Sequence, residues 1–177
     1  MTILDQLADH ARERVAAAQR AVPLEELRRQ ACSLPKGNFA FERAMGREGL
    51  SFICECKKAS PSKGLIAPEF PYLQIAKEYE AAGADGISVL TEPKWFLGSD
   101  RYLEEIARAV SAPCLRKDFT VDAYMIYQAK VLGASAVLLI CSILTQGQLT
   151  DYLHLCDELG LSALVEIHDE AEGETAL

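Results

Sequence analysis

Residues 81–90 read AAGADGISVL, and this ten-residue pattern indicates the fold class. Two later stretches repeat it, VLGASAVLLI at 131–140 and ELGLSALVEI at 158–167. In each one a helical segment ends at a glycine (Gly83, Gly133 or Gly160), a few small or polar residues follow, and an apolar run begins. Glycine suits the left-handed backbone position after a helix, so its recurrence indicates one helix-to-strand unit that is used several times.

Short apolar runs alternate with amphipathic segments from Ser51 onward. We expect strands at 51–55, 86–90, 113–116, 136–140 and 162–166, and helices at 71–82, 100–110, 122–132 and 145–159. Apolar residues at helical spacing also predict a helix near the N-terminus, capped by Thr2 and Asp5, and a short one follows over 24–30. Such an alternation predicts a parallel sheet buried on both faces, either doubly wound or a (βα)8 barrel.

Ionisable residues at the ends of three different strands favour the barrel. Glu55 and Lys57 follow the first strand, Lys117 the third and Glu166 the fifth. Because side chains alternate along a strand, Glu55 and Lys57 share one face, and apolar residues precede Lys117 and Glu166 on theirs. An apolar interior with charges at its rim is typical of a barrel, and no G-x-G-x-x-G motif follows the first strand to suggest dinucleotide binding.

The composition excludes several classes of function. Half of the 177 residues are hydrophobic and the net charge is -8, so the chain can bury a sizeable core but would repel nucleic acid and anionic membranes. No apolar run is long enough for a membrane span. We expect a cytoplasmic protein with a small-molecule ligand, no nucleic-acid partner and no membrane partner.

The six cysteines and three histidines do not form a metal-binding pattern. Cys54 and Cys56 could be half of a zinc site, but no second Cys or His pair follows at a matching spacing. The sequence therefore predicts that the cysteines are buried small hydrophobic residues and that they bind no metal.

Five motifs in a fixed order carry a specific resemblance. They are ECKKASPSKG (55–64), TEPKWFLGS (91–99), LRKDF (115–119), VLLICSIL (137–144) and LVEIH (164–168). Together they resemble the indole-3-glycerol phosphate synthases, lyases of tryptophan biosynthesis. The resemblance implies a cofactor-free ring closure of 1-(2-carboxyphenylamino)-1-deoxyribulose 5-phosphate to indole-3-glycerol phosphate, with loss of carbon dioxide and water.

The resemblance also implies the roles of individual residues. Lys117 matches the general acid, and Lys57 matches the lysine that holds the substrate carboxylate and serves as an acid in dehydration. Glu166 matches the general base or charge stabiliser, and Glu55 orients the lysines. Substrate contacts are implied for a further set of residues: Ser60, Pro61, Leu90, Phe96, Leu115, Phe119, Leu138 and Ile140.

Other interpretations of the same residues stay open. Arg116 and Lys117 could simply pair with Asp118 at a sheet rim. The chain could instead be another phosphosugar-binding barrel, an isomerase or an aldolase that forms a Schiff base through Lys117. It could also be a non-catalytic partial barrel that acts as a binding or assembly module.

We expect an N-terminal helical extension at 1–46 and a partial (βα)8 barrel with strands 1 to 5 at 47–177. A full barrel has eight strands, and the final residues AEGETAL look like the start of the helix after the fifth strand. The expectation is a truncated chain that lacks the last three units and much of the phosphate site. Its exposed sheet edges would favour self-association or a complementing C-terminal fragment.

Overall fold

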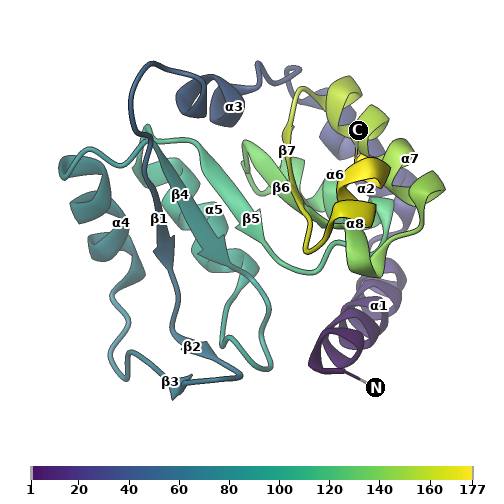
Figure 1. The fold of residues 1–177 in the computed structure, drawn as a ribbon, viewed down its shortest axis with the longest axis horizontal. Helices are drawn as coiled ribbons and strands as arrows, with labels where there is room; N and C mark the ends of the chain where they lie inside the picture. Colours follow the sequence, from purple (N-terminus) through teal and green to yellow (C-terminus); the bar gives the residue numbers. More distant parts are fainter. Residues whose placement is uncertain (1, 177) are drawn as a thin grey trace.

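The computed structural model describes residues 2–176, shown in Figure 1. The helices are α1 (Ile3–Ala21), α2 (Leu24–Ser33), α3 (Ala40–Met45), α4 (Tyr72–Ala81), α5 (Asp100–Ala109), α6 (Ala123–Val131), α7 (Gln146–Leu159) and α8 (Glu170–Ala176), with a short 3-10 helix η1 (Cys141–Ile143). The strands are β1 (Ile53–Cys56), β2 (Ala59–Ser60), β3 (Gly64–Leu65), β4 (Gly86–Leu90), β5 (Cys114–Lys117), β6 (Ala136–Ile140) and β7 (Ser162–Glu166).

The main sheet has five strands in the order β1-β4-β5-β6-β7, and every neighbouring pair is parallel. Strand order thus follows chain order, as in a (βα)8 barrel, whereas a doubly wound sheet would reverse direction at a switch point. The register aligns Leu90 with Lys117 and Ile140 with Glu166, so the charged strand ends meet at one rim. The expected partial barrel is confirmed.

The turn pattern that predicts the fold has the expected geometry. Gly83, Gly133 and Gly160 all have positive φ, at 91°, 86° and 68°. Each glycine lies one or two residues after the end of a helix and precedes a strand, where a left-handed residue lets the chain reverse direction. The three strands after these glycines, β4, β6 and β7, begin and end at the predicted residues.

The main hydrophobic core lies between the sheet and the helices on its outer side. Ile87 of β4, Leu103 and Ile106 of α5, and Ile126 of α6 are all completely buried there. Residues of α1 and α2, including Ala11 and Ala31, belong to the same core. The expected division at residues 46 and 47 stays a prediction.

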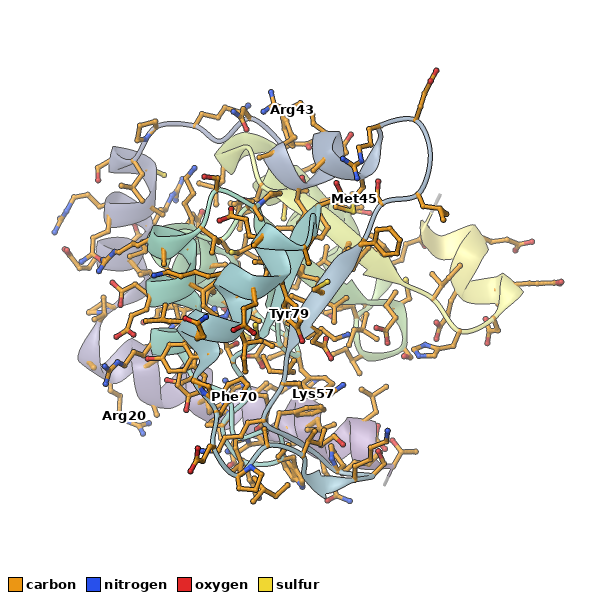
Figure 2. The ribbon with its side chains drawn as sticks, turned by 90° about the vertical axis from the view of Figure 1, so that its left-hand side faces the viewer. Arg20, Arg43, Met45, Lys57, Phe70 and Tyr79 are labelled. Carbon is orange, nitrogen blue, oxygen red and sulfur yellow. The ribbon has the colours of Figure 1, made fainter. Side chains whose placement is uncertain are left out.

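The two ends of the partial barrel are covered by different helices. Ile3, Leu4 and Leu7 of α1 line a pocket at the carboxyl ends of the strands. At the amino ends, Phe41 of α3 packs with Leu115 in a second, smaller core. Figure 2 shows Met45 and Lys57 at opposite ends of β1. The rim that carries the charged residues is therefore the one that α1 covers.

Residues 2–176 contain three features that the sequence did not predict: the helix α3, the hairpin of β2 and β3, and the short 3-10 helix η1. Other predicted ends are off by a few residues: β1 spans Ile53–Cys56 rather than 51–55, and α2 continues to Ser33. The capping box of Thr2 and Asp5 at the start of α1 is present as predicted.

Both outer strands of the sheet have an unpaired edge within residues 2–176, since β1 pairs only with β4 and β7 only with β6. Apolar side chains lie exposed along them: Phe52 and Ile53 at β1, and Leu164 and Ile167 at β7. No helix in the described part of the chain is both long and apolar enough to cross a membrane.

Candidate active site

A pocket of about 450 Å³ lies at the carboxyl ends of the strands, beneath α1. All four predicted catalytic residues line it, and so do five of the predicted substrate contacts, Leu90, Phe96, Phe119, Leu138 and Ile140. The residues come from all five parallel strands or the segments that follow them. Because the strands are parallel, their carboxyl ends converge on one rim, which explains why residues so distant in sequence meet.

Lys57 and Glu55 form a pair on one side of the pocket. The Lys57 ammonium donates to Oε1 of Glu55 at 2.8 Å, and the Ser88 hydroxyl donates to the second carboxylate oxygen at 3.0 Å. The Lys57 side chain is 36% exposed, so it faces the pocket rather than the core. A carboxylate held by two donors is fixed in place, and it orients the lysine in turn.

Lys117 and Glu166 form a second, looser pair on the opposite side. The Lys117 ammonium lies 3.4 Å from Oε2 of Glu166, and Nε2 of His168 lies 3.3 Å from the other oxygen. Lys117 thus pairs with Glu166 across the pocket rather than with Asp118, whereas Arg116 does lie 3.8 Å from Asp118. The site holds two lysines, each with its own carboxylate.

Apolar side chains form the wall between these pairs. The rings of Phe96 and Phe119 lie 6.1 Å apart, centre to centre. Leu138 and Ile140 are almost fully buried on β6. A flat aromatic group would find apolar contacts on this wall and charged groups at its edges.

Three predicted substrate contacts are absent from the pocket lining within the described residues. Leu115 packs instead against Phe41 and Ala136 in the smaller core. It precedes Lys117 by two residues on the same face of β5, so it lies one layer deeper in the barrel. Ser60 is buried at the β2 end of the hairpin, where its hydroxyl accepts from the backbone N–H of Lys63 at 3.2 Å, and Pro61 is exposed at the hairpin tip.

Five pocket residues were not predicted as contacts. Ile3, Leu4 and Leu7 come from α1, and their helical spacing predicts an apolar face without saying what that face covers. His168, the last residue of the LVEIH motif, contacts Glu166 with Nε2 and Glu172 with Nδ1. Asp118 adjoins the predicted acid Lys117, which was the one available signal for it.

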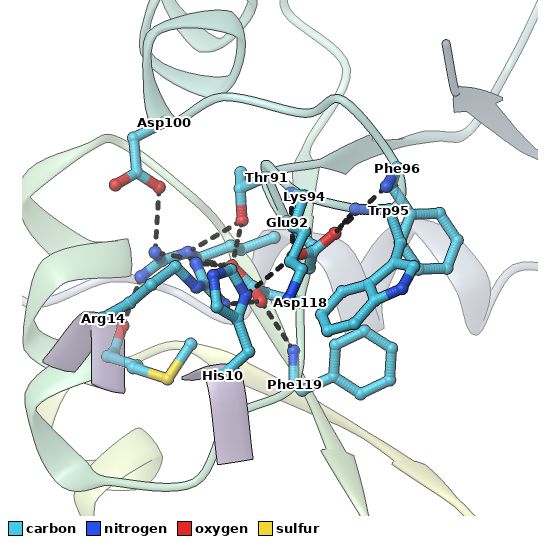
Figure 3. A network of polar contacts seen from close by, with 12 residues as sticks. His10, Arg14, Thr91, Glu92, Lys94, Trp95, Phe96, Asp100, Asp118 and Phe119 are labelled. Atoms are coloured by element: carbon cyan, nitrogen blue, oxygen red, sulfur yellow. Dashed lines mark hydrogen bonds and ion pairs between the residues drawn. The ribbon is translucent and has the colours of Figure 1, made fainter. Parts of the chain in front are cut away.

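Asp118 anchors α1 to the rim (Figure 3). Its buried carboxylate accepts two hydrogen bonds from Arg14 of α1, at 2.6 and 3.1 Å, and one from Thr91 at 2.6 Å. Burial raises the pKa of Asp118, but the nearby charges of Arg116 and Arg14 outweigh it and hold the pKa below its usual value. This charged network fixes the residue next to Lys117 on one side and the cover helix on the other.

The cysteines lie away from this chemistry. Cys56 is on the opposite face of β1 from Glu55, and burial raises the pKa of its thiol to about 12. Within residues 2–176 no cluster of three or more His, Cys, Asp or Glu side chains is arranged to hold a metal ion. The pocket lining includes two lysines, which can bind anions or donate protons, and the carboxylates that pair with them.

A parallel sheet in barrel order, with lysine and glutamate side chains at its carboxyl rim, defines this chain as a (βα)8-barrel protein with an enzyme-like acid–base pocket. The sequence model of the family described as indole-3-glycerol phosphate synthase matches residues 4–177. The chain therefore belongs to the indole-3-glycerol phosphate synthase family.

Relatives named indole-3-glycerol phosphate synthase align over nearly the whole chain. The protein of Ruminiclostridium cellulolyticum is 53% identical over 99% of this chain, that of Lachnoclostridium phytofermentans 50% over 99%, and that of Endomicrobium trichonymphae 51% over 99%. This chain spans 68%, 69% and 68% of their respective lengths.

Proposed function

We propose that the pocket catalyses the ring closure of 1-(2-carboxyphenylamino)-1-deoxyribulose 5-phosphate to indole-3-glycerol phosphate in tryptophan biosynthesis. The observation that carries the proposal is the pair of lysine–carboxylate contacts on either side of an aromatic wall. The substrate has the matching parts, a carboxylated aromatic ring and a carbonyl that must be protonated. The family name supports the same reaction.

In this proposal Lys117 is the general acid. As the ring carbon that bears the carboxylate attacks the ribulose carbonyl, the new carbon–carbon bond forms and the carbonyl oxygen takes a proton from the Lys117 ammonium. Glu166, at 3.4 Å, stabilises that ammonium and accepts a proton later in the sequence. Loss of carbon dioxide returns the electron pair to the ring, and loss of water gives the indole.

Lys57 takes the substrate carboxylate in the same proposal. Its ammonium is held by Glu55 at 2.8 Å and faces the pocket. It is therefore already oriented to pair with an incoming anion. It also supplies a proton in the dehydration step. Ser60 and Pro61 remain proposed substrate contacts on the hairpin that follows β1.

We further propose that additional parallel strands complete the barrel at the free edges of β1 and β7. Exposed Phe52 and Ile53 on one edge, and Leu164 and Ile167 on the other, support this. Unpaired edges with apolar side chains attract other strands. The partner is either a complementing segment, such as the part of a full-length relative that lies beyond the matched region, or a second copy of this chain.

The cytoplasm is the proposed location. All six cysteines are free, as is typical of proteins in reducing compartments.

The test is to incubate the purified chain with the substrate and follow the fluorescence of indole-3-glycerol phosphate. A parallel sample contains the chain co-expressed with the unmatched part of the Ruminiclostridium cellulolyticum relative. We expect product that Lys117→Ala does not form, and faster formation in the complemented sample. No product in either sample would contradict the proposed reaction. A substrate adduct trapped by borohydride would instead favour Schiff-base chemistry.

A further inference from the structure

Glu92 is a buried carboxylate in the loop between β4 and α5 that the proposed chemistry does not use. Its side chain has no exposed surface. One oxygen accepts the backbone N–H groups of Trp95 at 2.7 Å and Phe96 at 3.0 Å, and the other accepts that of Lys94 at 3.0 Å. Burying a carboxylate is costly, and here three backbone donors offset that cost.

These bonds hold a tightly turned loop. The backbone N–H of Gly98 donates back to the carbonyl of Glu92 at 2.8 Å, which closes the loop on itself. Leu97 has a φ of 51°, a left-handed conformation that is unfavourable for a leucine. Such a conformation persists where surrounding contacts enforce it. Bonds to Glu92 lie on both sides of Leu97: the Glu92 carboxylate accepts from the N–H groups of Trp95 and Phe96, and the Glu92 carbonyl accepts from that of Gly98.

The same loop supplies the aromatic wall of the pocket. Phe96 lines the pocket beside Phe119, and its own backbone N–H is one of the three that Glu92 holds. Glu92 itself is absent from the pocket lining. Any effect of this carboxylate on a bound ring must therefore pass through residues that it holds, and Phe96 is one of them.

Glu92 also contacts the cover helix (Figure 3). Nδ1 of His10 in α1 lies 3.1 Å from Oε1 of Glu92, and the His10 ring meets the Trp95 ring edge to face at 5.3 Å. His10 is one helical turn from Leu7, which lines the pocket. One carboxylate thus connects two separate walls of the pocket, the loop with Phe96 and the helix α1.

We propose that Glu92 is a positioning residue that fixes Phe96 and α1 and thereby determines how tightly the pocket binds the aromatic ring of its substrate. This inference rests on the proposed function for the identity of the ring. It assigns Glu92 no role in proton transfer, so its loss weakens ring binding and spares the chemical step.

The test compares Glu92→Gln with Glu104→Gln, a control on α5 whose side chain is 38% exposed and pairs with Arg108. Glutamine keeps the size of the side chain but replaces one acceptor oxygen with a donor, which must then face a backbone N–H or His10. Binding of N-(2-carboxyphenyl)glycine, a ring with the substrate's amine and carboxylate, is measured by calorimetry. We expect about tenfold weaker binding for Glu92→Gln, since an unsatisfied buried donor is costly, and no change for the control.

Two readouts follow the loop directly and need no turnover. Trp95 is the only tryptophan of the chain, so tryptophan emission reports on this loop alone, and hydrogen exchange reports on residues 92–98. We expect Glu92→Gln to shift the emission and to speed the exchange. With substrate, KM should rise by about the same factor as the dissociation constant of the probe, while kcat changes less than about twofold.

Unchanged emission and exchange in Glu92→Gln would overturn the proposal, and so would wild-type binding of the ring probe or a fall in kcat at constant KM. If the wild-type chain binds the probe but forms no product, the proposed function fails while this inference stands. If it does not bind the probe, the inference fails. Circular dichroism shows whether Glu92→Gln folds. If it does not, His10→Leu is the second variant, because it removes only the contact with α1 and should weaken probe binding about threefold. Unchanged probe binding in His10→Leu would contradict the proposal.

Discussion

Lys117 and Glu166 meet across the pocket although a whole strand separates the two strands that carry them. Lys117 ends β5 and Glu166 ends β7, with β6 in the middle, and the two side chains approach to 3.4 Å. That is longer than the 2.7–2.9 Å typical of a strong charge-assisted hydrogen bond, and each side chain is about one-third exposed. The contact between the two side chains is therefore loose, and a ligand can enter between them.

Replacing Lys117 by alanine should reduce turnover by roughly 100-fold or more, the range in which a general acid contributes. Lys63→Ala is the matched control, because it removes another lysine of the same chain from the exposed hairpin. It should lower turnover only a few-fold. Initial rates of product fluorescence measure both variants, and equal losses would contradict the role assigned to Lys117.

Glu166→Gln should lower kcat by about 100-fold while the melting temperature stays close to that of the wild type. The carboxylate is partly exposed, so its loss leaves no buried charge unpaired in the core. Steady-state kinetics and a thermal melt on the same sample check this. Wild-type rates would exclude Glu166 as the base.

Asp118 should make the free energy of unfolding depend on pH in the acidic range. Its pKa is lowered in the folded state, so its stabilising effect is present above its unfolded value of about 3.9 and is lost as the pH falls through the lower folded value. Asp118→Asn should be less stable at neutral pH, because Arg14 and Arg116 lose their buried partner, by about 3 kcal/mol. Urea unfolding at several pH values tests this.

The comparison between the two proteins gives the sign of the effect. Below pH 4 the wild type should lose stability more steeply than Asp118→Asn, so that the gap between them narrows. A gap that stays constant from pH 7 to pH 3 would mean that the carboxylate is not ionised and paired in the folded protein.

The cysteines should differ sharply in reactivity. Cys32 is exposed, whereas burial raises the pKa of Cys56, Cys114 and Cys156 to about 12. Because the thiolate is the reactive form, a thiol reagent at pH 8 should modify Cys32 quickly and those three only after unfolding. Mass spectrometry of the labelled peptides identifies the sites. Fast labelling of Cys114 in the folded protein would contradict the packing of β5.

Much of the barrel could be predicted because its signals are local. A glycine after each helix and an apolar run after each glycine locate β4, β6 and β7 to the residue. The hairpin over 59–65 was missed since its Ser, Pro and Gly residues look like an irregular loop. The short helix α3 has a single buried residue, Phe41, and too few turns to show a period.

The sequence could predict which strand face each site residue lies on, but not how deep in the barrel each residue lies. Alternation along a strand places Lys117 and Leu115 on the same side, yet it does not say that Leu115 lies one layer lower, against Phe41. The role of α1 was also hidden. Its apolar face is visible in the sequence, but only tertiary structure shows that Leu7 covers the pocket and that His10 reaches Glu92.

The proposed function requires that the substrate binds in the pocket between the two lysine–carboxylate pairs. The most direct measurement is a crystal structure of the Lys117→Ala variant soaked with 1-(2-carboxyphenylamino)-1-deoxyribulose 5-phosphate, which that variant should bind without converting. We predict the aromatic ring against Phe96 and Phe119, with its carboxylate at Lys57. A substrate bound elsewhere on the protein, with this pocket empty, would contradict the account.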